Sequence, residues 1–128
     1  MLQNLKDKIV CVTGAARRVG RAIMVEFARQ GTHVVIHHSN SDADATSAAR
    51  EARDMGVDAL IIKADQSNPD DVEGMFGMIR EHYGRLDIMV NSAASFKRAP
   101  LLDVSLAEWQ VVLGVNLTGP FLCTPRGL

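Results

Sequence analysis

The chain lacks several features that would place it outside the cell, in a membrane or on nucleic acid. It has only two cysteines, Cys11 and Cys123, which are too few for a disulfide framework. Its 14 basic and 15 acidic side chains leave a net charge of −1, with no basic stripe to neutralise a nucleic-acid backbone. The N-terminus has no signal-peptide core, and the longest uncharged stretch, residues 109–125, is broken by glycine and proline. We therefore expect a cytoplasmic protein that binds neither nucleic acid nor membrane.

What is present fits one folded domain. The 128 residues are 47% hydrophobic and 23% charged, which is usual for a globular protein. A chain of this length buries roughly two-thirds of its unfolded surface, which is enough for a core. Cys11 falls in the first apolar run, where we expect a buried, reduced thiol.

Strand-like and helical patterns alternate along the chain. Apolar runs typical of strands begin near residues 8, 33, 58 and 86. The helical patterns between them end at Gly31, Gly56 and Gly84. Residues that resemble helix N-caps are Ser41, Asn68 and Ser105. Continuous apolar strands joined by short loops to helices predict a doubly wound α/β domain with a parallel sheet and right-handed crossovers.

The sheet expected from this pattern is incomplete. The first four strands of a Rossmann-type fold lie in the order 3-2-1-4, and a full sheet adds further strands beside the fourth. Nothing strand-like follows residues 86–91; instead there is a loop, a helix from about Ser105 and a short tail. The fourth strand would then be an apolar, unpaired edge, and it or the C-terminal helix could join a homo-oligomer.

The eight residues Thr13-Gly14-Ala15-Ala16-Arg17-Arg18-Val19-Gly20 lie between the first strand and the first helix. Small residues in such a turn let the backbone approach a phosphate, and the N–H groups and positive dipole end of the helix point at it. Arg17 and Arg18 add two guanidinium groups, whose geometry suits phosphate. The alternative for either arginine is a solvated surface charge. The turn therefore predicts binding of a dinucleotide.

The end of the second strand favours NADP(H) over NAD(H). An acidic residue there would bond a ribose 2′-OH and repel a 2′-phosphate, yet no carboxylate occurs between His37 and Asp42. Ser41 could cap the following helix and also bind an anion. His37 could be a cofactor contact or a surface residue at the end of the strand. We expect no metal site, because His37 and His38 point to opposite faces of the strand.

Several motifs at matching spacing together resemble the short-chain dehydrogenase/reductase family. They are Thr-Gly-x-x-x-Arg-x-Gly from Thr13, Ala64-Asp65, Gly84-Arg85-Leu86-Asp87, Asn91-Ser92-Ala93-Ala94 and Asn116-Leu117-Thr118-Gly119. The resemblance runs from about residue 5 to residue 122. With Arg18 in place of the family's middle glycine, the first motif is similar to the pteridine-reductase branch, as is the spacing from His37 to Ser41.

The resemblance implies that the chain binds NADP(H) along the carboxyl edge of the sheet. The implied cofactor-binding residues are Thr13, Gly14, Arg17, Arg18, Val19, Gly20, His37, Ser41, Asp65, Gln66, Asn91 and Ala93. In the family the position of Asp65 bonds the adenine amino group, and a plain loop charge is the alternative. The position of Asn91 is as much structural as functional, because it holds the middle of the sheet and borders the cofactor.

Two further residues are implied in catalysis and substrate binding. Pro120 would leave the carbonyl of Asn116 without its helical donor, and in the family the matching asparagine supports a proton-relay water. The alternative is a helix that ends near residue 117, with Asn116 merely exposed. Phe96 resembles a position that stacks on the pterin ring in pteridine reductases, and packing on its own domain is the alternative. A 3-oxoacyl or sugar-type substrate is equally open.

The family's catalytic tyrosine and lysine are missing from this chain. The family uses Tyr-x-x-x-Lys and a serine, whereas the only tyrosine here is Tyr83 and residue 87 is aspartate. Tyr83 lies on the apolar face of the third helical pattern, so we expect it in the core. We interpret residues 1–128 as the NAD(P)-binding domain of a reductase, truncated before its catalytic region and not catalytic alone. A non-catalytic dinucleotide-binding module and an interaction fragment are the alternatives.

Overall fold

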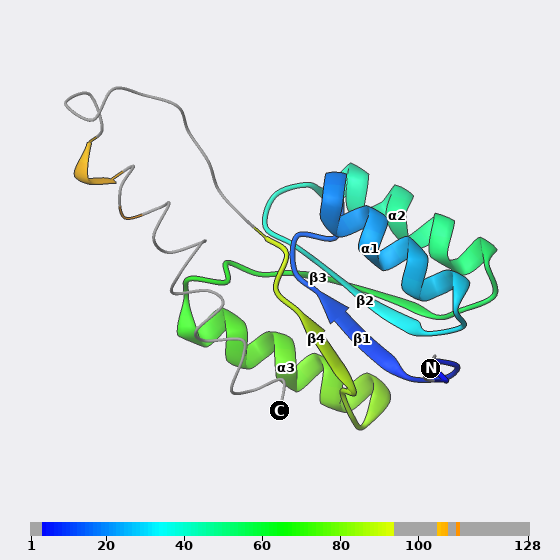
Figure 1. The fold of residues 1–128 in the computed structure, drawn as a ribbon. Coiled ribbons are helices and arrows are strands. Elements are labelled where there is room, and N and C mark those ends of the chain that lie inside the picture. Colours follow the sequence, from blue (N-terminus) through cyan, green and yellow to red (C-terminus); the bar gives the residue numbers. More distant parts are fainter. Residues whose placement is uncertain (1–3, 94–104, 108–109, 111–128) are drawn as a thin grey trace.

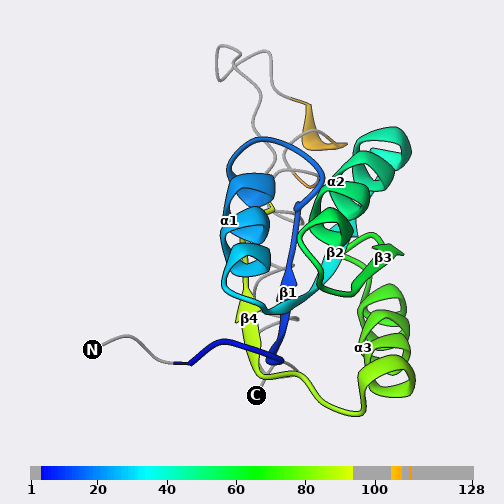
Figure 2. The same ribbon diagram turned by 90° about the vertical axis from the view of Figure 1, so that its right-hand side faces the viewer.

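Four parallel strands form the sheet in the part of the chain that the structure describes, and helices cover both of its faces. The computed structural model describes residues 4–93, 105–107 and 110. The elements are, in chain order, β1 (Ile9–Val12), α1 (Arg18–Arg29), β2 (His33–His38), α2 (Asp42–Asp54), β3 (Ala59–Lys63), α3 (Pro69–Tyr83) and β4 (Ile88–Val90). The strands lie in the order β3-β2-β1-β4, as Figure 2 shows. The predicted α/β topology is confirmed.

The alternation of side chains along the strands divides the core into two layers. Successive residues of a strand point to opposite faces, so Val10 and Val12 pack in one layer and Ile9 and Cys11 in the other. Figure 1 shows α1 and α2 on the first face and α3 on the second. The first layer receives the small residues of α2, which are Ala45, Ala48, Ala49 and Ala52. The second receives Val72, Met75, Phe76 and Ile79 of α3.

The predicted N-cap residues of α2 and α3 both begin their helices, but only the one of α3 makes a capping hydrogen bond. The side chain of Asn68 accepts hydrogen bonds from the backbone N–H groups of Asp70 and Asp71, at 2.9 and 3.3 Å. Ser41 occupies the predicted N-cap position of α2, but its side chain makes no capping hydrogen bond. Its backbone has φ −111° and ψ 55°, outside the extended conformation from which a capping side chain reaches the helix N–H groups.

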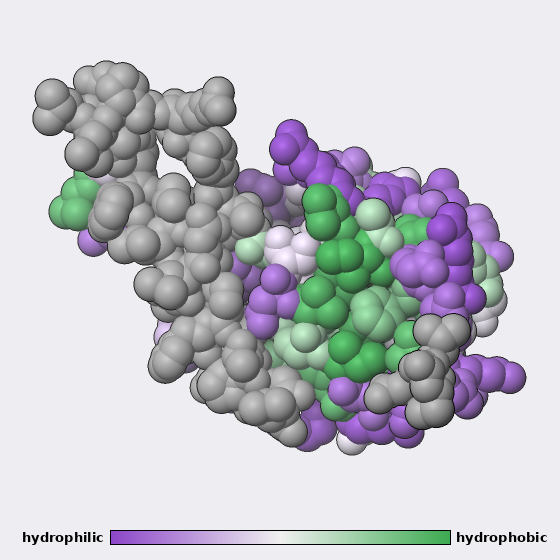
Figure 3. All heavy atoms as spheres, in the orientation of Figure 1, coloured by the Kyte–Doolittle hydropathy of each residue, from purple (hydrophilic) through white to green (hydrophobic). Residues whose placement is uncertain are grey.

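Strand β4 lies at one edge of the described sheet. Ile88, Met89 and Val90 pair with β1 alone among the described strands, and all three are only half-buried. Figure 3 shows an apolar area over α1 and β4, the elements that carry half-buried Ile23, Phe27, Ile88 and Val90. Within the described residues, no helix is long and apolar enough to cross a membrane.

Candidate functional site

Gly14 and Gly20 allow close packing at the turn between β1 and α1, Gly14 against the segment after β4 and Gly20 against the turn itself. Gly14 has a φ of +63°, which glycine adopts readily, and a Cβ there would lie 2.8 Å from the Cα of Ala93. A Cβ on Gly20 would overlap the carbonyl oxygen of Gly14. The turn therefore needs glycine at both positions. It presents backbone at the carboxyl edge of the sheet, where ligands of open α/β sheets bind.

Thr13 ties this turn to the segment after β4. Its backbone N–H donates to the carbonyl of Val90 at 3.0 Å. Its Oγ1 accepts hydrogen bonds from the backbone N–H groups of Ser92 and Ala93, at 2.9 and 3.0 Å, and lies 3.5 Å from the Val90 carbonyl, to which it donates. The buried hydroxyl thus holds the position of Ala93 against Gly14. Contact of Thr13 with a cofactor stays a prediction.

His37, in β2, forms a hydrogen bond with the same turn. The imidazole is buried, with 2% of its surface exposed, which excludes the alternative of a surface residue. Nδ1 accepts a hydrogen bond from the backbone N–H of Gly14 at 3.1 Å, and Nε2 therefore carries the hydrogen that it donates to the Ala64 carbonyl at 2.9 Å. Burial lowers the pKa of His37, which favours the neutral ring. Both ring nitrogens have protein partners, and a contact with cofactor stays a prediction.

The start of α1 is open to an anion. Within the described residues no side chain caps this helix, and its first turn contains no acidic residue. Arg17, at the N-cap, and Arg18 and Val19, at the first helical positions, are exposed, Val19 to 69%. Arg18 has a φ of +56°, a left-handed conformation that glycine adopts more readily than arginine. The helix end thus carries two exposed arginines and uncapped backbone N–H groups, a combination that suits an anion.

Arg17 forms an ion pair at the protein surface, and its contact with a cofactor stays a prediction. Its Nε lies 3.6 Å from Oδ2 of Asp44 in the first turn of α2. Both side chains remain about half-exposed, at 61% and 49%, so the pair orients the guanidinium more than it stabilises the fold. The contact directs Arg17 towards the carboxyl end of β2.

A second charged group at the end of β2 was not predicted from the sequence. Asp42 Oδ1 lies 3.4 Å from Nζ of Lys63 and 3.7 Å from Nε2 of His38. His38 is buried, and its Nδ1 accepts a hydrogen bond from the backbone N–H of Ser41 at 3.1 Å. Burial lowers the pKa of His38. The signal that could have found this group is the basic residue at the last position of β3, which lies beside His38 in the strand register.

Asp65 shapes the loop between β3 and α3. Its Oδ1 accepts hydrogen bonds from the backbone N–H and the hydroxyl of Ser67, at 3.0 and 2.6 Å. Its backbone N–H donates to Oδ2 of Asp71 at 2.8 Å, and neighbouring Gln66 is buried. The carboxyl side chain is exposed at the carboxyl edge of the sheet, so the predicted contact with adenine is sterically open.

Of the remaining predicted residues, two lie in the described part of the chain and two lie outside it. Asn91 is exposed directly after β4, and Ala93 lies against Gly14. Phe96 and Asn116 lie outside the described residues. No group of three or more potential metal ligands that could hold an ion occurs in the described part of the chain.

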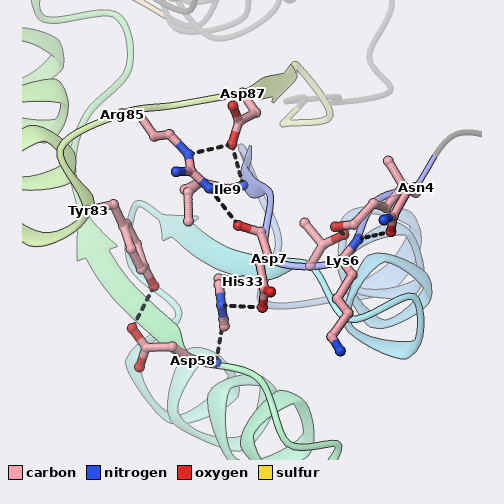
Figure 4. A network of polar contacts seen from close by, with 11 residues as sticks. Asn4, Lys6, Asp7, Ile9, His33, Asp58, Tyr83, Arg85 and Asp87 are labelled. Carbon is pink, nitrogen blue, oxygen red and sulfur yellow. Dashed lines mark hydrogen bonds and ion pairs between the residues drawn. The ribbon is translucent and has the colours of Figure 1, made fainter.

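Tyr83 lies in a separate polar network at the amino edge of the sheet, which Figure 4 shows. Its ring is half-buried against the second core layer, as expected, but its hydroxyl donates to Oδ2 of Asp58 at 2.9 Å. Burial, followed by this hydrogen bond, raises the pKa of Tyr83 strongly. The backbone N–H of Asp58 donates to Nδ1 of His33, the first residue of β2. His33 and His37 are four residues apart on one strand, so about 13 Å separates this network from the glycine turn.

Proteins of known family resemble this chain in sequence. A sequence profile described as short chain dehydrogenase matches residues 8–128. A 3-oxoacyl-[acyl-carrier-protein] reductase from Synechocystis sp. is 33% identical over 120 residues, which cover 94% of this chain and 49% of that protein.

Solved structures resemble it in fold. A blue fluorescent protein from a metagenomic library, in complex with NADPH, superposes with a TM-score of 0.90 at 29% identity, over 98% of this chain and 51% of that one. A short chain dehydrogenase from Burkholderia cenocepacia, in complex with NADP, superposes with a TM-score of 0.93 at 30% identity, again over 98% and 51%. The chain thus spans about half the length of these relatives.

Proposed function

Because the chain belongs to the short-chain dehydrogenase family, we propose that residues 1–128 are the NADP(H)-binding domain of an oxidoreductase of this family. The observation that carries the proposal is the uncapped start of α1, which has no acidic residue in its first turn and where Arg17 and Arg18 are exposed. Backbone N–H groups and the positive helix end attract the pyrophosphate of a dinucleotide. A Cβ on Gly14 would clash with Ala93 and shift the turn that leads into this helix start.

The proposed contacts follow the carboxyl edge of the sheet. The turn residues Thr13, Gly14, Val19 and Gly20 surround the pyrophosphate, directly or by holding the turn. Arg17, Arg18 and Ser41 face the adenosine ribose and its 2′-phosphate at the end of β2, and His37 contributes by fixing the turn. Asp65 and Gln66 lie where the adenine would pack, and Asn91 and Ala93 border the nicotinamide side.

NADP(H) is proposed over NAD(H) because positively charged side chains near the expected ribose site favour a 2′-phosphate, and a carboxylate that would bind a 2′-OH is lacking. No carboxylate occurs between His37 and Ser41 to accept a hydrogen bond from a 2′-OH. Guanidinium groups bind phosphate oxygens in a bidentate manner, and two are available at this edge. The solved relatives that carry NADPH or NADP support the same choice.

We propose that this chain binds the cofactor without reducing a substrate on its own. Tyr83 is its only tyrosine, and its hydroxyl is bonded to Asp58 at the opposite edge of the sheet. The strongly raised pKa of Tyr83 also makes it a poor proton donor for a reaction near neutral pH. A catalytic role for Asn116 would require partners that this chain does not contain.

We also propose a substrate class, self-association and a cellular location for the protein. The Thr-Gly-Ala-Ala-Arg-Arg-Val-Gly turn supports a pteridine-reductase-like lineage with Phe96 near the substrate, whereas the Synechocystis relative supports a 3-oxoacyl substrate. The half-buried edge at β4 supports self-association, which sedimentation would detect. A cytoplasmic location is consistent with the two-cysteine composition.

Fluorescence titration of the chain with NADPH and NADH tests the proposed function. We expect NADPH to bind with a dissociation constant between about 1 μM and 1 mM, and NADH to bind more weakly. Gly14→Ala should weaken binding, and Gly77→Ala in α3, where a Cβ meets nothing within 4 Å, is the matched control. Absence of NADPH binding by a folded chain would overturn the proposal, and equal affinities would overturn the preference for NADP(H).

A further inference from the structure

Asp42 is the first carboxylate after β2. Its negative charge has a positively charged neighbour, Lys63. The ammonium of Lys63 lies 3.4 Å from its Oδ1, and the Nε2 of His38 lies 3.7 Å from the same oxygen. Lys63 is the last residue of β3 and pairs with His38 in the sheet register. A cation from the neighbouring strand thus reaches the acidic start of α2.

Lys63 is the group that compensates the charge of Asp42. His38 is buried with a lowered pKa, and its Nδ1 already accepts a hydrogen bond from the backbone N–H of Ser41, so its ring is neutral. The other carboxylate in the first turn of α2, Asp44, is paired with Arg17 instead. Removing the Lys63 ammonium would leave Asp42 with a neutral imidazole as its near neighbour.

We propose that Lys63 is a specificity-determining residue for the dinucleotide and acts through Asp42, raising the preference for a 2′-phosphate over a 2′-hydroxyl. The inference rests on the proposed function. An uncompensated carboxylate here repels a 2′-phosphate and accepts a hydrogen bond from a 2′-OH, so its compensation favours the phosphorylated ligand. The side chains of Lys63 and Asp42 are 59% and 72% exposed, so water and salt limit the size of the effect.

Two adenosine fragments that differ only in the phosphate, 2′,5′-ADP and 5′-AMP, probe this contact without the nicotinamide half. Isothermal titration calorimetry on the full chain compares wild type, Lys63→Met, Asp42→Asn and the double variant at low ionic strength. We expect Lys63→Met to reduce the ratio of the 2′,5′-ADP affinity to the 5′-AMP affinity about threefold. In the Asp42→Asn background, where no carboxylate accepts from the 2′-OH, the same substitution should reduce the ratio less than in the wild type.

The control variant Lys6→Met removes the same charge at the amino edge of the sheet and should not change the ratio. An equal loss with and without Asp42 would overturn the inference, because Lys63 would then act on the phosphate itself. An unchanged ratio in Lys63→Met would also overturn it. Failure of the wild-type chain to bind either fragment would instead refute the proposed function, and the inference with it.

Discussion

The backbone N–H of Gly14 donates a hydrogen bond to Nδ1 of His37 over 3.1 Å and joins the glycine turn to β2. The same imidazole donates from Nε2 to the carbonyl of Ala64, so one neutral ring spans the ends of three neighbouring chain segments. A protonated imidazole carries a hydrogen on both nitrogens and cannot accept from Gly14. The geometry of the turn therefore depends on the protonation state of a buried histidine.

Lowering the pH should destabilise the fold through this histidine. Burial holds the pKa of His37 below the usual 6.5 in the folded chain, so between the folded and unfolded values the unfolded chain binds more protons. The contribution of His37 to the free energy of unfolding is thus complete above a pH of about 6.5. It is lost as the pH falls towards the pKa of His37 in the folded chain. Thermal unfolding between about pH 8 and 5 measures the effect.

The variant His37→Asn isolates the contribution of this ring. Its amide oxygen can accept from Gly14 but does not titrate, so Tm should fall less steeply with decreasing pH than in the wild type. The slope should shrink rather than vanish, because burial also lowers the pKa of His38. An identical pH profile in the variant would show that His37 does not couple to folding.

Replacing Thr13 by valine should destabilise the chain and loosen the segment after β4. Valine keeps the shape of threonine but leaves the N–H groups of Ser92 and Ala93 without their acceptor, at a cost of about 1–3 kcal/mol. Thr13→Ser keeps the hydroxyl and is the matched control. Denaturant unfolding measures the free energy, and hydrogen exchange should be faster at both N–H groups in the valine variant alone. Equal exchange in the two variants would contradict the assigned role of the hydroxyl.

Arg18→Gly should raise stability while it lowers the affinity for NADPH. The backbone at Arg18 has a φ of +56°, where a side chain costs about 1 kcal/mol that glycine avoids. The same substitution removes one of the two guanidinium groups at the start of α1. Arg17→Gly is the comparison, because Arg17 has an extended backbone and its loss brings no such relief. Chemical denaturation and NADPH titration of both variants separate the two effects, and a destabilised Arg18→Gly would refute the argument from strain.

Local patterns in the sequence were sufficient to predict the architecture. The helical spacing of apolar residues, together with Asn68 and Gly84 at its two ends, predicted α3. In the structure Asn68 is the N-cap and Gly84 the C-cap of this helix. The strand order followed from the alternation of elements, because parallel strands joined by helices allow few topologies. The glycine turn was also found from sequence, since its place between a strand and a helix is a local property.

The contacts inside the site could not be predicted in the same way. His37 reaches Gly14 and Ala64, which are 23 and 27 residues away, and nothing in the sequence near His37 shows that both ring nitrogens have buried partners. Lys63 meets Asp42 only because β2 and β3 pair in one particular register. The left-handed backbone of Arg18 depends likewise on how the turn packs. Side-chain partners across strands thus require the fold to be known.

Tyr83→Phe should lower stability and leave the affinity for NADPH unchanged. The hydroxyl donates to Asp58 at the amino edge of the sheet, as Figure 4 shows, and its loss removes one hydrogen bond to a charged group, worth about 1.5–3 kcal/mol if fully buried and less for this half-exposed pair. The ring of phenylalanine keeps the packing of the second core layer. Chemical denaturation gives the change in unfolding free energy, and NADPH titration gives the affinity. Because the glycine turn lies at the other edge of the sheet, a large loss of affinity in a well-folded Tyr83→Phe chain would mean that the ligand binds near Tyr83 and not at the start of α1.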